Sequence, residues 1–102
     1  MANKIIMIDF DNTIADTGKW HDGPISAAPI PGAKDKLQDL KEQGYTCIVL
    51  TAREDLNSVK IWLNENGFVY MEVTNKKVPA RAYIDDRGIR FTNWDDMARY
   101  FL

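Results

Sequence analysis

The chain has 102 residues, enough for one globular domain and too few for two. Hydrophobic residues make up 45% of it and charged residues 27%, a composition that excludes intrinsic disorder. The formal net charge of -2 excludes the whole-protein positive field that attracts nucleic acid or an anionic membrane.

The cysteine content and the apolar runs indicate where such a chain resides. Cys47 is the single cysteine, so no internal disulfide can form, and we interpret it as a small core residue. The first apolar run is too short for a signal peptide, and no apolar stretch is long enough to span a bilayer. We therefore expect a cytoplasmic protein in a reducing compartment.

The first half of the chain alternates between strand and helix patterns. Residues 5–8 form a continuous apolar run, which predicts a strand over residues 4–8 that is buried on both faces. Residues 14–31 carry glycines and prolines and are predicted to be a loop. A helix is expected from about Gly32 to Gly44, with Pro31 in its first turn, and a second strand at 45–50.

The second half repeats this alternation. We predict a helix at 56–66, strands at 68–73, 82–84 and 89–91, and a last helix from about Asn93, capped by Thr92 or Asn93. We interpret Trp62 and Trp94 as packing residues on these helices. The predicted fold is α/β: a doubly wound, Rossmann-like, mostly parallel sheet of four to five strands with helices on both faces, in one domain over residues 1–102.

Polar residues follow the predicted strands directly. Asp9, Thr51 and Asp85 each come immediately after a buried run. In open parallel sheets, ligands bind in the crevice beyond the carboxyl ends of the strands. The three segments are therefore expected to converge on one crevice.

The acids in this crevice predict a metal ion. Asp9 and Asp11 are two residues apart, so their carboxylates point the same way if the chain stays extended. Neighbouring carboxylates repel each other, and a hard cation such as Mg²⁺ relieves that repulsion. The predicted ligands are Asp9, the backbone carbonyl of Asp11, and Asp85 or Asp86.

Four segments together resemble the motifs of the haloacid dehalogenase superfamily of phosphatases. Ile8-Asp9-Phe10-Asp11-Asn12-Thr13 resembles its D-x-D-x-T signature, and Val49-Leu50-Thr51-Ala52-Arg53 its second motif. Lys77-Val78-Pro79 resembles the third motif, and Asp85-Asp86 the acidic fourth. The four stand in the family's order, so the resemblance covers most of the chain.

The resemblance implies a magnesium-dependent phosphomonoesterase. Asp9 would attack phosphorus and become an aspartyl phosphate, while Asp11 would act as general acid and base. Thr51 would hydrogen-bond a phosphoryl oxygen, and Lys77 would neutralise charge on Asp9 and the phosphoryl group.

Other residues beside the motifs are weaker candidates. Asp85 is favoured as the direct metal ligand, with Asp86 assisting. Lys76 is the alternative to Lys77, and either lysine could belong to a solvated turn. The predicted substrate contacts are Thr51, Ala52, Arg53, Lys77 and Arg87.

The loop at 14–31 holds Trp20 and His21 but leaves no room for a cap domain. We interpret Trp20 as an anchor of the loop and His21 as an exposed side chain, although both could touch a leaving group. A capless site is open to a bulky substrate or is covered by a neighbouring subunit, so a homo-oligomer stays open.

Several functions use similar residues. A phosphotransferase or mutase would share the aspartyl phosphate, and a non-catalytic phosphate-binding module could share the fold. A signalling receiver domain places its acidic pair after the first strand and its phosphorylated aspartate after the third, an order that differs from this one. The substrate is a phosphorylated small molecule or another phosphomonoester, and the sequence does not identify it.

Overall fold

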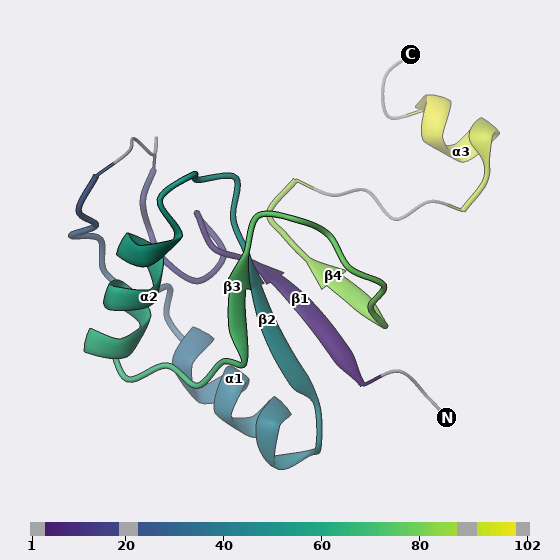
Figure 1. Ribbon diagram of the computed structural model, residues 1–102. Helices are drawn as coiled ribbons and strands as arrows, with labels where there is room; N and C mark the ends of the chain where they lie inside the picture. Colours follow the sequence, from purple (N-terminus) through teal and green to yellow (C-terminus); the bar gives the residue numbers. More distant parts are fainter. Residues whose placement is uncertain (1–3, 19–22, 88–91, 100–102) are drawn as a thin grey trace.

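A computed structural model describes residues 4–18, 23–87 and 92–99 of the chain. No helix among these residues has the length and apolar character needed to cross a membrane. The elements in chain order are β1 (Ile5–Asp9), α1 (Ala33–Glu42), β2 (Thr46–Leu50), α2 (Leu56–Glu65), β3 (Glu72–Thr74), β4 (Ala82–Ile84) and α3 (Trp94–Arg99) (Figure 1).

The four strands form one sheet in the order β3-β2-β1-β4, and every neighbouring pair is parallel. β1 lies between β2 and β4, with Ile8 opposite Val49 on one side and Ile84 on the other. This arrangement confirms the predicted parallel α/β fold. The predicted fifth strand at 89–91 lies outside the described residues.

The third strand begins later than predicted, at Glu72 instead of residue 68. Phe68 is used differently: its backbone N–H donates to the Leu63 carbonyl at 2.9 Å, which closes the end of α2. Its ring stacks on Trp62 with the ring centroids 5.4 Å apart. Because Phe68 packs against α2, the strand begins further along the chain, at Glu72.

The start of the first helix also differs from the prediction. Gly32 is its N-cap, with a φ of 87°, so Pro31 precedes the cap and does not belong to the first turn. Such a positive φ is readily adopted by glycine. At the other end of the chain, Asn93 is confirmed as a cap, because its Oδ1 accepts from the Asp96 backbone N–H at 2.9 Å.

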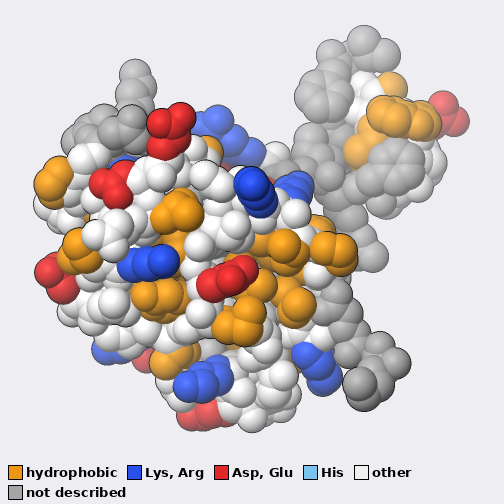
Figure 2. All heavy atoms as spheres, in the orientation of Figure 1, with side chains coloured by type: hydrophobic (Ala, Val, Ile, Leu, Met, Phe, Trp, Pro, Cys, Tyr) orange, Lys and Arg blue, Asp and Glu red, His pale blue; other side chains and the backbone are white. Residues whose placement is uncertain are grey.

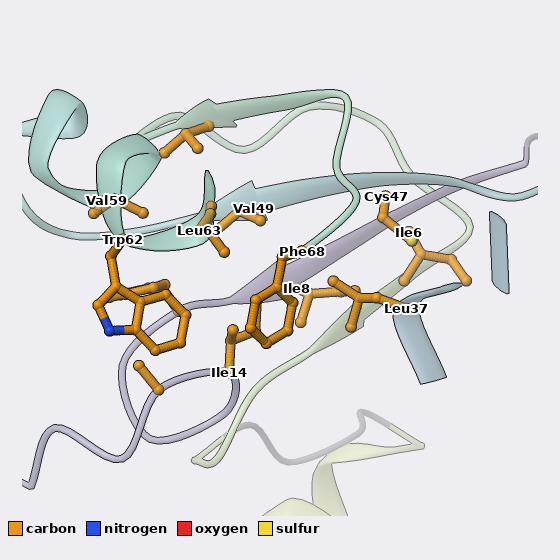
Figure 3. Close-up of a cluster of buried hydrophobic side chains, with 13 residues drawn as sticks. Ile6, Ile8, Ile14, Leu37, Cys47, Val49, Val59, Trp62, Leu63 and Phe68 are labelled. Carbon is orange, nitrogen blue, oxygen red and sulfur yellow. The ribbon is translucent and has the colours of Figure 1, made fainter. Parts of the chain in front are cut away.

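Trp62 belongs to the hydrophobic core between the sheet and the two longer helices (Figure 3). Its ring meets Phe10 edge to face, with the centroids 5.3 Å apart. Its Nε1 donates to the Ala27 carbonyl at 2.9 Å, which anchors the loop before α1. Cys47 is buried in the same core, as predicted. The cluster joins one face of the sheet to both helices through Ile6, Ile8, Cys47, Val49, Val73, Leu37, Val59, Trp62 and Leu63.

No helix among the described residues packs on the opposite face of the sheet. The prediction had placed helices on both faces. A short connection joins β3 to β4 on that opposite face, and its Val78 N–H donates to the Met7 sulfur at 3.4 Å. Figure 2 shows hydrophobic side chains gathered over β1 and β4. α3 packs against no other described helix or strand. Trp94 is 77% exposed, so it does not belong to the buried core, which differs from the prediction.

These two tryptophans give a matched stability test. Trp62→Phe removes the hydrogen bond to Ala27 and part of the core volume, so we expect it to lower the free energy of unfolding by about 2 kcal/mol. Trp94→Phe is the control and should change it by less than about 0.5 kcal/mol. Urea unfolding followed by far-ultraviolet circular dichroism measures both, and equal losses would contradict the assigned packing.

Candidate active site

The carboxyl ends of the strands open into one cavity of about 550 Å³. β1 ends at Asp9, the chain after β2 supplies Ala52, and the turn after β4 supplies two further residues. The lining residues are Asp9, Asp11, Asn12, Gly18, Ala52, Asp86 and Arg87. Five of these seven were sequence candidates, because strand ends predict the position of a crevice well.

Asp9 is a half-buried carboxyl group surrounded by other acids. Burial, followed by the charges of Asp86, Asp11 and Asp85, raises its pKa to about 6. A hydrogen bond from the Phe10 backbone acts in the opposite direction and is weaker. The acids that were predicted to converge therefore influence one another at the end of β1.

A compact loop after β1 holds the second acid. The Phe10 carbonyl accepts backbone N–H groups from Ile14 at 3.0 Å and Ala15 at 3.1 Å. Asn12 has a φ of 60°, and its side-chain amide exchanges two hydrogen bonds with the Gly18 backbone, at 2.7 and 2.8 Å. The sequence reasoning missed Asn12 and Gly18 as lining residues. Asn is enriched in left-handed backbone, so Asp-Asn-Thr was a usable turn signal.

Asp11 has a positively charged partner. Arg53 Nη2 lies 2.8 Å from Asp11 Oδ1, and Arg53 Nε lies 3.2 Å from Oδ2. Thr17 Oγ1 also donates to Asp11 Oδ1, at 2.8 Å. Arg53 is only 3% exposed and does not line the cavity. Arg53 therefore forms an ion pair with Asp11 in this structure, and its predicted contact with substrate stays a prediction.

Thr51 lies beneath the cavity and not on its wall. It is buried, and its Oγ1 accepts the Arg53 backbone N–H at 3.1 Å. Its own N–H donates to the Thr74 carbonyl at 3.0 Å, linking the ends of β2 and β3. Thr13, the last residue of the D-x-D-x-T segment, has a buried Oγ1 with no hydrogen-bond partner among the described residues.

Lys77 is not brought to the acids. Its Nζ lies 4.9 Å from the centre of the Tyr83 ring, and the lysine is exposed and absent from the cavity wall. The Tyr83 hydroxyl donates to the Val78 carbonyl at 2.5 Å, which fixes the ring beside this connection. Lys76 is exposed as well, with its backbone N–H on Thr74 Oγ1. The Lys77 ammonium therefore lies over the Tyr83 ring in this structure, and its predicted role at Asp9 stays a prediction.

The two acids after β4 have different positions. Asp85 Oδ1 accepts the Arg87 backbone N–H at 2.9 Å, which closes the turn. Asp86 lines the cavity and acts on Asp9 more strongly than Asp85 does. Asp86 is therefore the acid of this turn that lines the cavity, and the choice between Asp85 and Asp86 as metal ligand stays a prediction.

The oxygen atoms available at the site are of the kind that magnesium binds. Within residues 4–18, 23–87 and 92–99, no three His, Cys, Asp or Glu side chains gather into a ligand cluster. Magnesium, however, is usually bound through one or two carboxylates and keeps several waters. Asp9, Asp86 and the backbone carbonyl of Asp11 fit that requirement. The two remaining loop candidates, Trp20 and His21, lie outside the described residues.

Comparisons with known proteins support the architecture. No family model matches the chain, and no curated protein matches it. Among solved structures, the chain is similar to a conserved protein from Bacteroides thetaiotaomicron, with a TM-score of 0.69 and 24% sequence identity. The similarity covers 94% of this chain and 87% of that one, and it shows the shared fold.

The raised pKa of Asp9 gives a stability prediction for the metal-free protein. Its pKa is about 6 in the fold against the ordinary aspartate value of 3.8, so stability falls as the pH rises through this interval and stays lower above it. Asp9→Asn removes the charge. We expect it to increase the free energy of unfolding at pH 7.5 by roughly 1 to 2 kcal/mol, after allowance for solvent screening.

Urea unfolding at pH 7.5 and pH 3.5, with a metal chelator present, measures this effect. At pH 3.5 the difference between Asp9→Asn and the wild type should nearly vanish, because Asp9 is then protonated in the folded protein and mostly protonated in the unfolded chain. Asp16→Asn, an exposed acid in the same loop, is the matched control and should change little at either pH. Destabilisation by Asp9→Asn at pH 7.5 would contradict the assigned repulsion.

Proposed function

We propose that the protein is a magnesium-dependent phosphohydrolase that acts through an aspartyl phosphate on Asp9. One observation carries the proposal: Asp9 ends β1 in an open cavity, where burial and the charges of Asp86 and Asp11 oppose its ionisation. A bound cation would favour the ionised carboxylate of Asp9 and would also reduce its repulsion of an anionic substrate. The four motifs that resemble the haloacid dehalogenase superfamily support the same chemistry.

Asp9, Asp86 and the backbone carbonyl of Asp11 would hold the metal ion. When bound, magnesium supplies positive charge that offsets the repulsion between a carboxylate nucleophile and a phosphate dianion. Arg87 is the only cationic side chain on the cavity wall among the described residues. We therefore infer that Arg87 contacts the phosphoryl group. Lys77 could take its predicted role only after its side chain leaves the Tyr83 ring.

The reaction proceeds in two half-reactions on the chain's own residues. An Asp9 carboxylate oxygen forms a bond to phosphorus while the bond from phosphorus to the leaving oxygen breaks, and Asp11 gives that oxygen a proton. A water molecule then attacks phosphorus and gives a proton to Asp11. The bond from phosphorus to Asp9 breaks, and inorganic phosphate leaves.

Hydrolysis of para-nitrophenyl phosphate tests the proposed activity. We expect turnover that requires Mg²⁺ in the wild type and falls to background in Asp9→Asn, because the amide is not a competent nucleophile. A circular dichroism spectrum of the variant serves as the folding control. Turnover that survives in Asp9→Asn, or that persists in chelator, would reject the mechanism.

A matched pair of variants tests the metal ligands. Asp86→Asn should increase the Mg²⁺ concentration for half-maximal activity by about 10- to 100-fold, since it removes a cavity carboxylate. Asp85→Asn, in the same turn, should shift that concentration much less. Magnesium titration of the phosphatase rate measures both, and a larger effect from Asp85→Asn would reverse the assignment.

A further inference from the structure

We propose that Arg53 and Thr17 are positioning residues that fix the Asp11 carboxylate so that its Oδ2 atom transfers the proton. The inference rests on the proposed function and concerns the geometry of its general acid and base. It assigns a role to Thr17, which no motif contains, and gives Arg53 a role other than the substrate contact first expected.

The two oxygens of Asp11 have unequal surroundings. Oδ1 accepts from Thr17 Oγ1 at 2.8 Å, from Arg53 Nη2 at 2.8 Å and from Arg53 Nε at 3.3 Å. Among the described residues, Oδ2 accepts only the remaining contact from Arg53 Nε, at 3.2 Å. Thr17 Oγ1 and Arg53 Nη2 occupy the two lone-pair sites of Oδ1, and the single Arg53 Nε–H is shared between the two oxygens, so Oδ2 is the oxygen with capacity for a proton.

The ion pair is well shielded from solvent. The Arg53 side chain is 4% exposed and that of Asp11 is 12% exposed. The arginine is itself fixed by its backbone N–H on Thr51 Oγ1, and its guanidinium carbon lies 6.0 Å from the centre of the Phe10 ring. A buried, two-pronged contact restricts the carboxylate to one orientation far more than an exposed pair does.

Thr17 restrains the carboxylate through a second donor to Oδ1. It belongs to the loop that the Asn12 and Gly18 hydrogen bonds close, so its hydroxyl has a defined position. Asp11 also lines the cavity. Arg53 from the end of β2 and Thr17 from the loop therefore hold one oxygen while the group still faces the substrate space.

The proton transfers follow from this arrangement. In the first half-reaction, the O–H bond at Asp11 Oδ2 breaks and the proton passes to the leaving oxygen as its bond to phosphorus breaks. In the second, Oδ2 takes a proton from the attacking water. A displacement of about 1 Å in such a group can cost on the order of 100-fold in rate.

The test compares leaving groups in Thr17→Val, which keeps the shape of the side chain and loses the hydroxyl. The value of kcat/KM covers the chemistry up to departure of the leaving group. Para-nitrophenolate needs little protonation, whereas the alkoxide of glycerol 2-phosphate needs it fully. We expect Thr17→Val to lower kcat/KM by roughly 10-fold or more for glycerol 2-phosphate and by less than about 3-fold for para-nitrophenyl phosphate.

Conservative variants separate positioning from a general structural role. Thr17→Ser retains the hydroxyl and should restore the activity on glycerol 2-phosphate. Arg53→Lys keeps the charge but loses the fork, so it should show the same dependence on the leaving group as Thr17→Val. Equal losses for both substrates, or no loss for either, would overturn the positioning role. A wild type without magnesium-dependent turnover of either substrate would instead reject the proposed function, and the positioning role with it.

Discussion

The parallel register of β1 with its two neighbours determines where every polar group of the site emerges. Ile8 lies opposite Val49 on β2 and Ile84 on β4, so the three strands end at one edge of the sheet. A slip of one residue in β1 would exchange its two faces and expose Ile6 and Ile8. The helices bury that face around Trp62, so core packing enforces the register that the site needs.

The two acids of the D-x-D segment occupy different electrostatic environments although they are two residues apart. Burial and the surrounding carboxylates raise the pKa of Asp9, while Asp11 is held by Arg53 and Thr17. Pairs of titratable groups in contrasting surroundings are typical of sites that divide the chemistry between them. In the proposed mechanism, the first forms the covalent bond and the second carries the proton.

The sequence predicted the frame of the site because buried strands leave a continuous apolar signature. The ends of β1 and β4 were recognisable from runs that stop at Asp9 and Asp85, and their convergence follows from the parallel fold. The ends of strands and helices were less predictable where a hydrophobic side chain could belong either to a strand or to the packing at the end of a helix. Phe68 has the composition of a strand residue, but it stacks on Trp62 and closes a helix instead.

Contacts between distant side chains could not be predicted from the spacing of residues. Arg53 reaches Asp11 because the loop after β1 folds back to the end of β2, and no local pattern encodes that approach. Lys77 is held by Tyr83, whose position depends on the connection between β3 and β4. Trp94 has the spacing of a packing residue, but periodicity identifies an apolar side of a helix without naming a partner.

Chemical trapping of the intermediate tests the central claim most directly. Borohydride reduces an aspartyl phosphate to homoserine, and peptide mass spectrometry then locates the modified residue. During turnover with Mg²⁺ and a phosphomonoester, we expect homoserine at position 9, and none when either component is omitted. Turnover with homoserine at another aspartate, or with none anywhere, would contradict the assignment of Asp9 as the nucleophile.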